Sequence, residues 1–151
     1  MHVVEHDLVP LQPSILLLDL GALKRNEPRE ELAELGKMSE AGAVAFSDDG
    51  NPIMNSELMR RALEYSKMFG RPIISHAEDA TLTKGFVMND GPVAAELGLR
   101  GYPNAAEAAM VARDIYLAEL TEGHAHIAHV STREAVDLVR QAKKRGIHIT
   151  A

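Results

Sequence analysis

The sequence predicts an α/β fold built on a parallel sheet, and two observations carry this prediction. Short apolar or β-branched runs alternate along the chain with longer segments whose apolar residues recur at helical spacing. A glycine stands between a helix-like segment and the next strand-like run at Gly42, Gly70, Gly123 and Gly146. Repeated strand–helix–strand units place their strands parallel, with right-handed crossovers. We expect residues 1–151 to form a single domain with a sizeable core.

The strand-like runs are short and bounded by turn residues. They predict strands at residues 14–18, 43–46, 72–75, 124–129 and 147–150. Runs of this length, rich in Ile, Val and Leu, are typical of strands buried in a parallel sheet. The run at 72–75 begins with proline, which a strand tolerates at its first residue.

Helical periodicity predicts four main helices, at residues 30–40, 56–69, 105–120 and 131–144. The helix at 56–69 has the clearest apolar stripe, and Gly70 follows it as a stop signal. Asn104 is expected to cap the helix at 105–120. The sequence Ser131-Thr132-Arg133-Glu134 has the pattern of a capping box at the start of the last helix.

Residues 80–103 interrupt this rhythm with a stretch rich in glycine and proline. One short helix is expected there, at about residues 93–97. A loop of this length inside a compact domain is usually functional or mobile.

Composition excludes several classes of protein. The absence of cysteine rules out a disulfide scaffold, a thiolate metal site and a cysteine nucleophile. A net charge of −6 without a basic stripe argues against nucleic-acid binding. The longest apolar run, residues 15–18, is too short to span a membrane, and the first residues do not look like a secretory signal. We therefore expect a cytoplasmic protein.

Polar side chains follow three of the predicted strands where each strand ends. Asp48 and Asp49 follow the run at 43–46, His76 follows the run at 72–75, and His129 ends the run at 124–129. Active sites of α/β folds lie at the carboxyl ends of the strands, and imidazole and carboxylate are ligands that suit a catalytic zinc ion. Taken singly, Asp-Asp-Gly is often a simple turn and a lone histidine is often structural. Their coincidence at one edge makes a metal site a hypothesis of equal weight to the structural interpretation.

His124 and His126 belong to the same strand as His129 but alternate away from it. Residues two apart in a strand share a face, so His124 and His126 point together while His129 points to the opposite side. We interpret His124 and His126 as packing or solvent-facing histidines.

The segments AFSDDG, HAED and HVST, in this order and spacing, resemble the middle of bacterial type I dihydroorotases of the amidohydrolase superfamily. The resemblance extends from about residue 21 to residue 151. It implies a (β/α)8 TIM-type barrel, of which this chain covers roughly strands 3 to 7. It also implies one or two zinc ions and the reversible conversion of dihydroorotate to N-carbamoyl-L-aspartate in pyrimidine biosynthesis.

The resemblance also implies roles for individual residues. His76 and His129 match two histidine ligands, and Asp49, rather than Asp48, matches a carboxylate ligand. Asn89 matches a family residue to which we assign no role. The family's aspartate general base would lie beyond Ala151, so no catalytic residue is assigned here. Residues 1–13 do not resemble the family, and its opening His-x-His is not found before residue 14.

Several interpretations stay open at this point. The chain is either part of a dihydroorotase that is active only with the rest of its barrel, or part of a related cyclic amidase such as a hydantoinase or allantoinase. Alternatively, it is an inactive structural module that associates with aspartate transcarbamoylase, or a fragment without biological meaning. Homo-oligomerisation is a further expectation about its partners.

Overall fold

The computed structural model describes residues 32–48 and 50–151. Its helices are α1 (Leu35–Glu40), α2 (Ser56–Lys67), α3 (Ala80–Thr83), α4 (Pro92–Leu97), α5 (Ala105–Thr121) and α6 (Arg133–Lys144). Its strands are β1 (Phe46–Ser47), β2 (Ile73–Ser75), β3 (Met88–Asn89), β4 (Gly101–Tyr102), β5 (Ala125–Ile127) and β6 (Ile149–Thr150). The strand predicted at residues 14–18 lies outside the described residues. No helix in the described part of the chain is both long and apolar enough to cross a bilayer.

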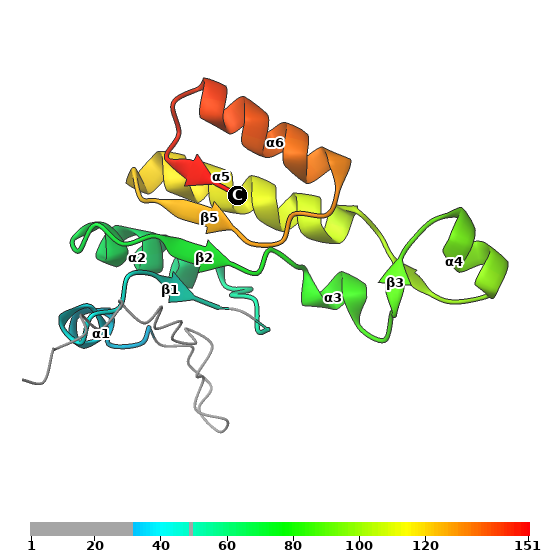
Figure 1. Cartoon of the computed structure of the whole chain (residues 1–151), viewed down its shortest axis with the longest axis horizontal. Coiled ribbons are helices and arrows are strands. Elements are labelled where there is room, and N and C mark those ends of the chain that lie inside the picture. The colour runs from blue at the N-terminus through cyan, green and yellow to red at the C-terminus, as the bar shows by residue number, and fades with distance from the viewer. Residues whose placement is uncertain (1–31, 49) are drawn as a thin grey trace, which may run out of the picture.

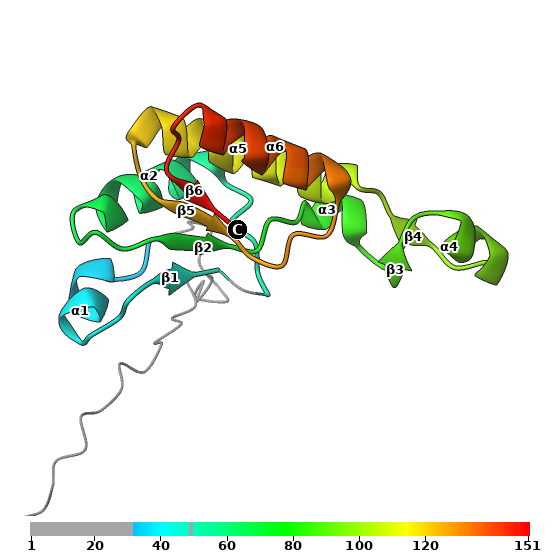
Figure 2. The ribbon, with the colours of Figure 1, turned by 45° about the horizontal axis from the view of Figure 1, so that its top comes forward.

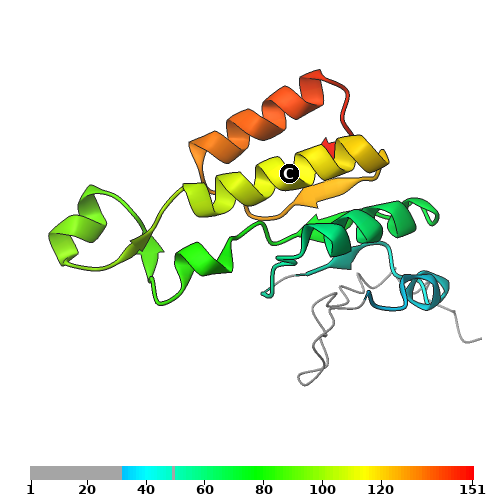
Figure 3. The ribbon, with the colours of Figure 1, turned by 180° about the vertical axis from the view of Figure 1, so that it is seen from behind.

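Four parallel strands form the central sheet, in the order β1-β2-β5-β6. Helices α2, α5 and α6 lie together on one face of it (Figures 1 to 3). Each of these helices comes before the next strand of the sheet in the chain, as in repeated strand–helix–strand units. The prediction of an α/β fold with a parallel sheet is confirmed.

The core lies between the sheet and these helices. Buried and partly buried residues alternate along β2 and β5, so that Ile73 and Ile127 are buried while Ile74 and His126 are only half-buried. The helices contribute Leu58, Met59, Ala62, Leu63, Val111, Ile115, Val139 and Ala142 to the same cluster. Apolar burial between the sheet and its helices is the main stabilising contribution in such a layered structure.

The strands are shorter than predicted, and β1 is shifted along the chain. Pairing of β1 with β2 begins where the Phe46 amide donates to the Pro72 carbonyl at 3.1 Å, and continues where the Asp48 amide donates to the Ile74 carbonyl at 3.3 Å. Ala43 is buried, but its amide donates back to the Met38 carbonyl at 3.0 Å, which closes the turn after α1. The prediction of a strand over residues 43–46 is therefore wrong at its start.

The helices α2, α5 and α6 occur where predicted, but two of the predicted caps are wrong. Asn104 stands at the N-cap position of α5 with helical backbone angles, but its side chain makes no cap hydrogen bond; its side-chain Nδ2 donates instead to a carboxylate oxygen of Glu134 at 3.2 Å. The cap of α6 is Thr132, whose hydroxyl accepts from the Ala135 amide at 3.2 Å. Ser131 does not cap this helix, because Glu107 binds its backbone and side chain.

The segment between α3 and α5 is an excursion that extends away from the central sheet (Figure 1). It contains a two-stranded parallel pair, in which Met88 is opposite Gly101 and Asn89 is opposite Tyr102. A Cβ at Gly101 would collide with the backbone of Asp90, so this close approach requires glycine. The short helix predicted at residues 93–97 is confirmed as α4.

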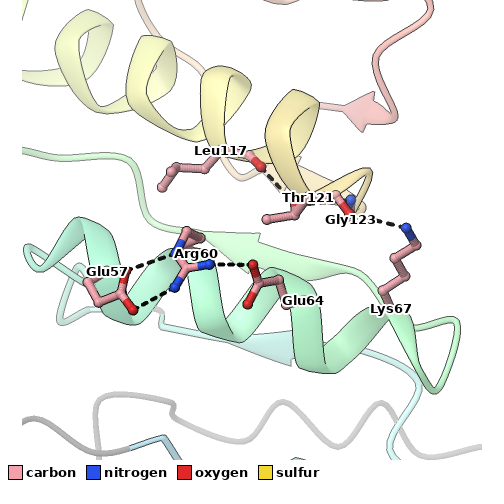
Figure 4. Close-up of polar contacts among 7 residues, drawn as sticks. All are labelled: Glu57, Arg60, Glu64, Lys67, Leu117, Thr121 and Gly123. Atoms are coloured by element: carbon pink, nitrogen blue, oxygen red, sulfur yellow. Dashed lines mark hydrogen bonds and ion pairs between the residues drawn. The ribbon is translucent and has the colours of Figure 1, made fainter.

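A hydrogen bond connects the carboxyl ends of α2 and α5 (Figure 4). Lys67, in the last turn of α2, donates to the Thr121 carbonyl at 3.2 Å. The Thr121 hydroxyl donates to the Leu117 carbonyl at 2.7 Å and accepts from the Gly123 amide at 3.1 Å. A lysine that binds the last carbonyls of a helix satisfies acceptors that the helix leaves open. This end of the molecule lies opposite the strand ends considered next.

Candidate metal centre

His76 and His129 meet at the carboxyl edge of the sheet. His76 directly follows β2 and His129 lies two residues after β5, and these two strands are neighbours. The Nδ1 atom of His76 is 2.8 Å from the Nε2 atom of His129, and the two rings meet at an interplanar angle of 74°. The structure thus brings together two of the residues that the sequence singled out as ligands.

The backbone at His129 is in an unusual conformation. Its φ of 38° lies in the left-handed region, which a residue other than glycine rarely adopts. Such a conformation costs on the order of 1–3 kcal/mol and persists only where the surrounding structure imposes it. Just before it, the Ala128 amide donates to the Ser75 carbonyl at 3.0 Å, which fixes the end of β5 against β2.

Glu78 holds the other side of the His76 ring. One carboxylate oxygen of Glu78 lies 3.1 Å from Nε2 of His76, and the other accepts from the Thr83 hydroxyl. A carboxylate on one ring nitrogen orients the imidazole, and metal-binding histidines commonly have such a partner. Glu78 was missed in the sequence, although its place two residues after His76 was a local signal.

Asp48 is fully buried and has a structural role in this region. One of its carboxylate oxygens accepts from the His76 amide at 2.6 Å, and the other accepts from the Ile53 amide at 2.9 Å. Asp48 therefore joins the end of β1 to the end of β2. The predicted ligand Asp49 lies outside the described residues. Within residues 32–48 and 50–151, no three His, Asp or Glu side chains are arranged as a metal site.

A buried ion pair supports the strand ends from the helix side. Asp114 of α5 is fully buried, and it accepts from the Ser75 hydroxyl at 2.7 Å and from two nitrogens of Arg113 at 2.9 and 2.7 Å. Burial raises the pKa of Asp114, and the adjacent Arg113 guanidinium opposes that shift. Arg113 also donates to the Ile53 carbonyl, which connects this pair to the segment after β1.

A cavity of about 250 Å³ lies beside the two histidines. The segments after β2 and β5 contribute Glu78 and Ser131 to its lining, α5 contributes Glu107, and the excursion contributes Asn89 and Tyr102. The excursion thus forms one wall of this cavity. Asn89, the loop residue that the resemblance singled out, lines the same cavity as His76 and His129.

His124 and His126 form a separate group of contacts. His124 Nε2 and His126 Nδ1 lie 3.0 and 2.9 Å from the hydroxyl oxygen of Thr150, so both share a face of the sheet, as strand alternation predicts. His124 also stacks on His148, with ring centroids 4.0 Å apart. Burial lowers the pKa of His124, and the nearby His148 and His126 lower it further.

Comparison with known proteins adds a decisive observation. The family model described as dihydro-orotase-like matches residues 13–135, which is most of the chain. The chain belongs to this family. It is 55% identical to a dihydroorotase of Pelotomaculum thermopropionicum over 141 residues, and 55% identical to one of Syntrophotalea carbinolica over 132 residues. These matches cover 93% and 87% of this chain but only 33% and 31% of the relatives. The chain thus spans about a third of the length of the curated relatives it matches.

Solved structures support the fold of this dihydro-orotase-like chain. An L-hydantoinase (dihydropyrimidinase) from Arthrobacter aurescens matches with a TM-score of 0.60, at 22% identity, over 77% of this chain and 28% of that protein. A D-hydantoinase (dihydropyrimidinase) from Thermus sp. matches with a TM-score of 0.59, at 24% identity, over 76% of this chain and 27% of that protein. The prediction of a partial TIM-type barrel is confirmed by these barrel neighbours.

Proposed function

We propose that this chain is the central part of a dihydroorotase and carries part of its metal centre. The proposed reaction is the reversible hydrolysis of the cyclic amide of dihydroorotate to N-carbamoyl-L-aspartate. The observation that carries the proposal is the convergence of His76 Nδ1 and His129 Nε2 at the edge of a parallel sheet. It is supported by membership of the dihydro-orotase-like family and by 55% identity to proteins named dihydroorotase.

The proposed ligands are His76, His129 and Asp49, and the proposed metal is zinc, as one or two ions. Two imidazole nitrogens and a carboxylate suit a catalytic zinc ion. Both carboxylate oxygens of Asp48 already accept backbone hydrogen bonds. This argument favours Asp49 as the carboxylate that the Asp-Asp-Gly sequence offers to a metal.

Each group in this region has a distinct task in the proposed reaction. A bound divalent metal supplies Lewis acidity at the amide carbonyl and lowers the pKa of water. Glu78 keeps Nδ1 of His76 directed toward His129, because it holds Nε2. The cavity beside the histidines, with Asn89 and Tyr102 in its wall, is the proposed place for the small-molecule substrate.

We assign no general base among these 151 residues. General acid–base catalysis contributes about 10²- to 10⁴-fold in typical enzymes. Because neither a general base nor the family's opening His-x-His is assigned among these residues, we expect the 151-residue polypeptide alone to hydrolyse no dihydroorotate at a measurable rate. Association with aspartate transcarbamoylase or with a second copy, and a cytoplasmic location, stay predictions. The hydantoinase alternative rests on likeness of fold alone.

Zinc bound per chain is the measurement that tests this proposal. The purified polypeptide is compared with the variants His76→Ala and His129→Ala, and His148→Ala serves as the matched histidine control. We expect stoichiometric zinc in the unaltered chain and in the control, and its loss in both site variants. His148 is suitable as a control because it stacks on His124, away from the proposed ligands.

Two outcomes would contradict the proposal. Zinc that persists in both His76→Ala and His129→Ala would show that these residues are not ligands. An absence of stoichiometric zinc in the unaltered chain would contradict the proposed ligand set, in which His76, His129 and Asp49 together hold zinc.

A further inference from the structure

Glu107 binds the segment that directly follows His129. It lies in the first turn of α5, 24 residues before Ser131. Its Oε1 accepts from the Ser131 amide at 2.7 Å, and its Oε2 accepts from the Thr132 amide at 2.7 Å and from the Ser131 hydroxyl at 3.2 Å. Three donors of one short segment therefore converge on one carboxylate.

This arrangement is electrostatically favourable for a carboxylate. The Ser131 and Thr132 amides stand at the beginning of α6, where the helix dipole adds a partial positive charge. Hydrogen bonds from amides to a carboxylate are shorter and stronger than those to a neutral acceptor. The two distances of 2.7 Å agree with such charge-assisted bonds.

His129 is therefore held on both sides. Before it, the bond from the Ala128 amide to the Ser75 carbonyl fixes the chain to β2. After it, the bonds to Glu107 fix Ser131 and Thr132 to α5. The left-handed backbone of His129 lies between these two fixed points and needs such support.

The same turn of α5 also contacts the segment that carries His76. The Asp79 amide, three residues after His76, donates to the Ala106 carbonyl at 2.9 Å. Adjacent residues of α5 thus bind the chain after β2 and the chain after β5. The start of this helix fixes the position of the two histidine-bearing segments relative to each other.

We propose that Glu107 is a positioning residue that sets the orientation of His129 toward His76. It acts through its bonds to Ser131 and Thr132, the segment that follows His129. Its importance for the reaction rests on the proposed function. Its effect on the His76–His129 contact is a property of the chain itself and can be tested without metal.

The test uses Glu107→Gln and Glu107→Asp in the full chain, with Glu134→Gln as the matched control. Glutamine keeps the size of Glu107 but has one acceptor oxygen, and aspartate keeps the charge but is too short to reach both amides. Glu134 lies in the first turn of α6, is exposed, and contacts Asn104 through its side chain.

NMR of the metal-free protein provides two measurements. The first is the nuclear Overhauser contact between the His76 and His129 rings, and the second is hydrogen exchange at the Ser131 and Thr132 amides. We expect both Glu107 variants to weaken the ring contact and to speed exchange about tenfold at these amides, as for loss of a charge-assisted hydrogen bond. The Glu134→Gln variant should match the unaltered chain.

Exchange at the Ile73 and Ala125 amides separates positioning from general stability. These amides lie in the sheet and donate to His124 and His148 carbonyls. An unchanged ring contact in Glu107→Gln, or an equal loss of protection at the sheet amides, would overturn the proposal. Zinc affinity, measured afterwards, should fall in the Glu107 variants; failure of the unaltered chain to bind zinc would instead count against the proposed function.

Discussion

Asp114 and Arg113 form an ion pair inside the protein. The Asp114 side chain is fully buried, and the Arg113 side chain is 14% exposed. Desolvation of two charges can cancel the attraction between them, so such a pair adds little net stability. Removal of one partner, however, leaves the other charge buried without compensation. The pair also connects Ser75 of β2 to the Ile53 carbonyl after β1. Loss of the pair should therefore also disturb the carboxyl edge of the sheet, where His76 and His129 lie.

Replacement of Asp114 by asparagine should therefore destabilise the fold strongly. We expect a loss of about 3 kcal/mol in the free energy of unfolding, the usual effect when one partner of a buried pair is removed. Urea unfolding measures it. The matched control is Asp137→Asn, which breaks the exposed pair with Arg140 and should cost about 0.5 kcal/mol. Equal effects of the two substitutions would show that the Asp114 pair is not buried in solution.

His124 makes stability depend on pH in a defined direction. Burial and the neighbouring His148 and His126 lower its pKa in the folded protein, so the unfolded chain binds a proton there more readily. Acidification through the ordinary histidine pKa, about 6.5, should therefore destabilise the fold, and the penalty should be absent well above that pH.

Urea midpoints at about pH 7.5 and about pH 5 test this dependence. The variant His124→Gln keeps a side chain that can bond to the Thr150 hydroxyl but does not titrate. Its midpoint should fall less on acidification than that of the unaltered chain. Identical pH dependence in the two proteins would show that His124 is not the group responsible.

Individual residues of the candidate site could be predicted only where they end a predicted strand. His76 and His129 could be found because both end strand-like runs, and the carboxyl ends of parallel strands meet at one edge. Glu107 and Asp114 were missed because their partners are distant in the chain. Glu107 pairs 24 residues ahead with Ser131, and Asp114 pairs 39 residues back with Ser75. No local pattern contains that information.

At the start of helix α6, two adjacent residues with hydroxyl side chains have different roles. Thr132 caps the helix, and Ser131 binds Glu107. Thr132→Ala should lower the free energy of unfolding by about 1 kcal/mol, the usual cost of an N-cap, whereas Thr132→Ser should be close to neutral. Ser131→Ala should cost less than Thr132→Ala, because the backbone bonds from the Ser131 and Thr132 amides to Glu107 remain in that variant. The reverse order in thermal or urea unfolding would restore Ser131 as the cap.

Helices and strands could be predicted where their apolar residues recur with a clear period. The helices α2 and α6 have apolar stripes and clear stop signals, and their positions followed from the sequence. The strands β3 and β4 could not be predicted, since each is two residues long and exists through pairing across α4. Their pairing depends on Gly101, where a side chain would meet the backbone of Asp90. An isolated glycine in a loop does not reveal such a contact.

In the molecule as a whole, one sheet and one layer of helices position the two histidines of the candidate metal centre. Among the described strands, β1 and β6 lie at the edges of the sheet, and β2 and β5 lie in its middle. The two histidines follow the two middle strands, where neighbours on both sides fix the backbone. Helix α5 packs against this pair and reaches both strand ends through Ala106 and Glu107. The candidate centre therefore lies at the ends of the two strands that are paired on both sides.

Because its proposed ligands come from separate strand ends, the metal centre should exist only in the folded chain. A ligand that binds the folded state alone stabilises it by RT ln(1 + [L]/Kd), which is about 2.7 kcal/mol at a concentration of 100 times Kd. Zinc at that excess should therefore raise the urea midpoint of the unaltered chain by roughly 1 M, for a typical denaturant dependence. The His76→Ala variant should show no such increase, because it lacks one of the paired nitrogens. An equal increase in both proteins would mean that zinc stabilises the chain at another place.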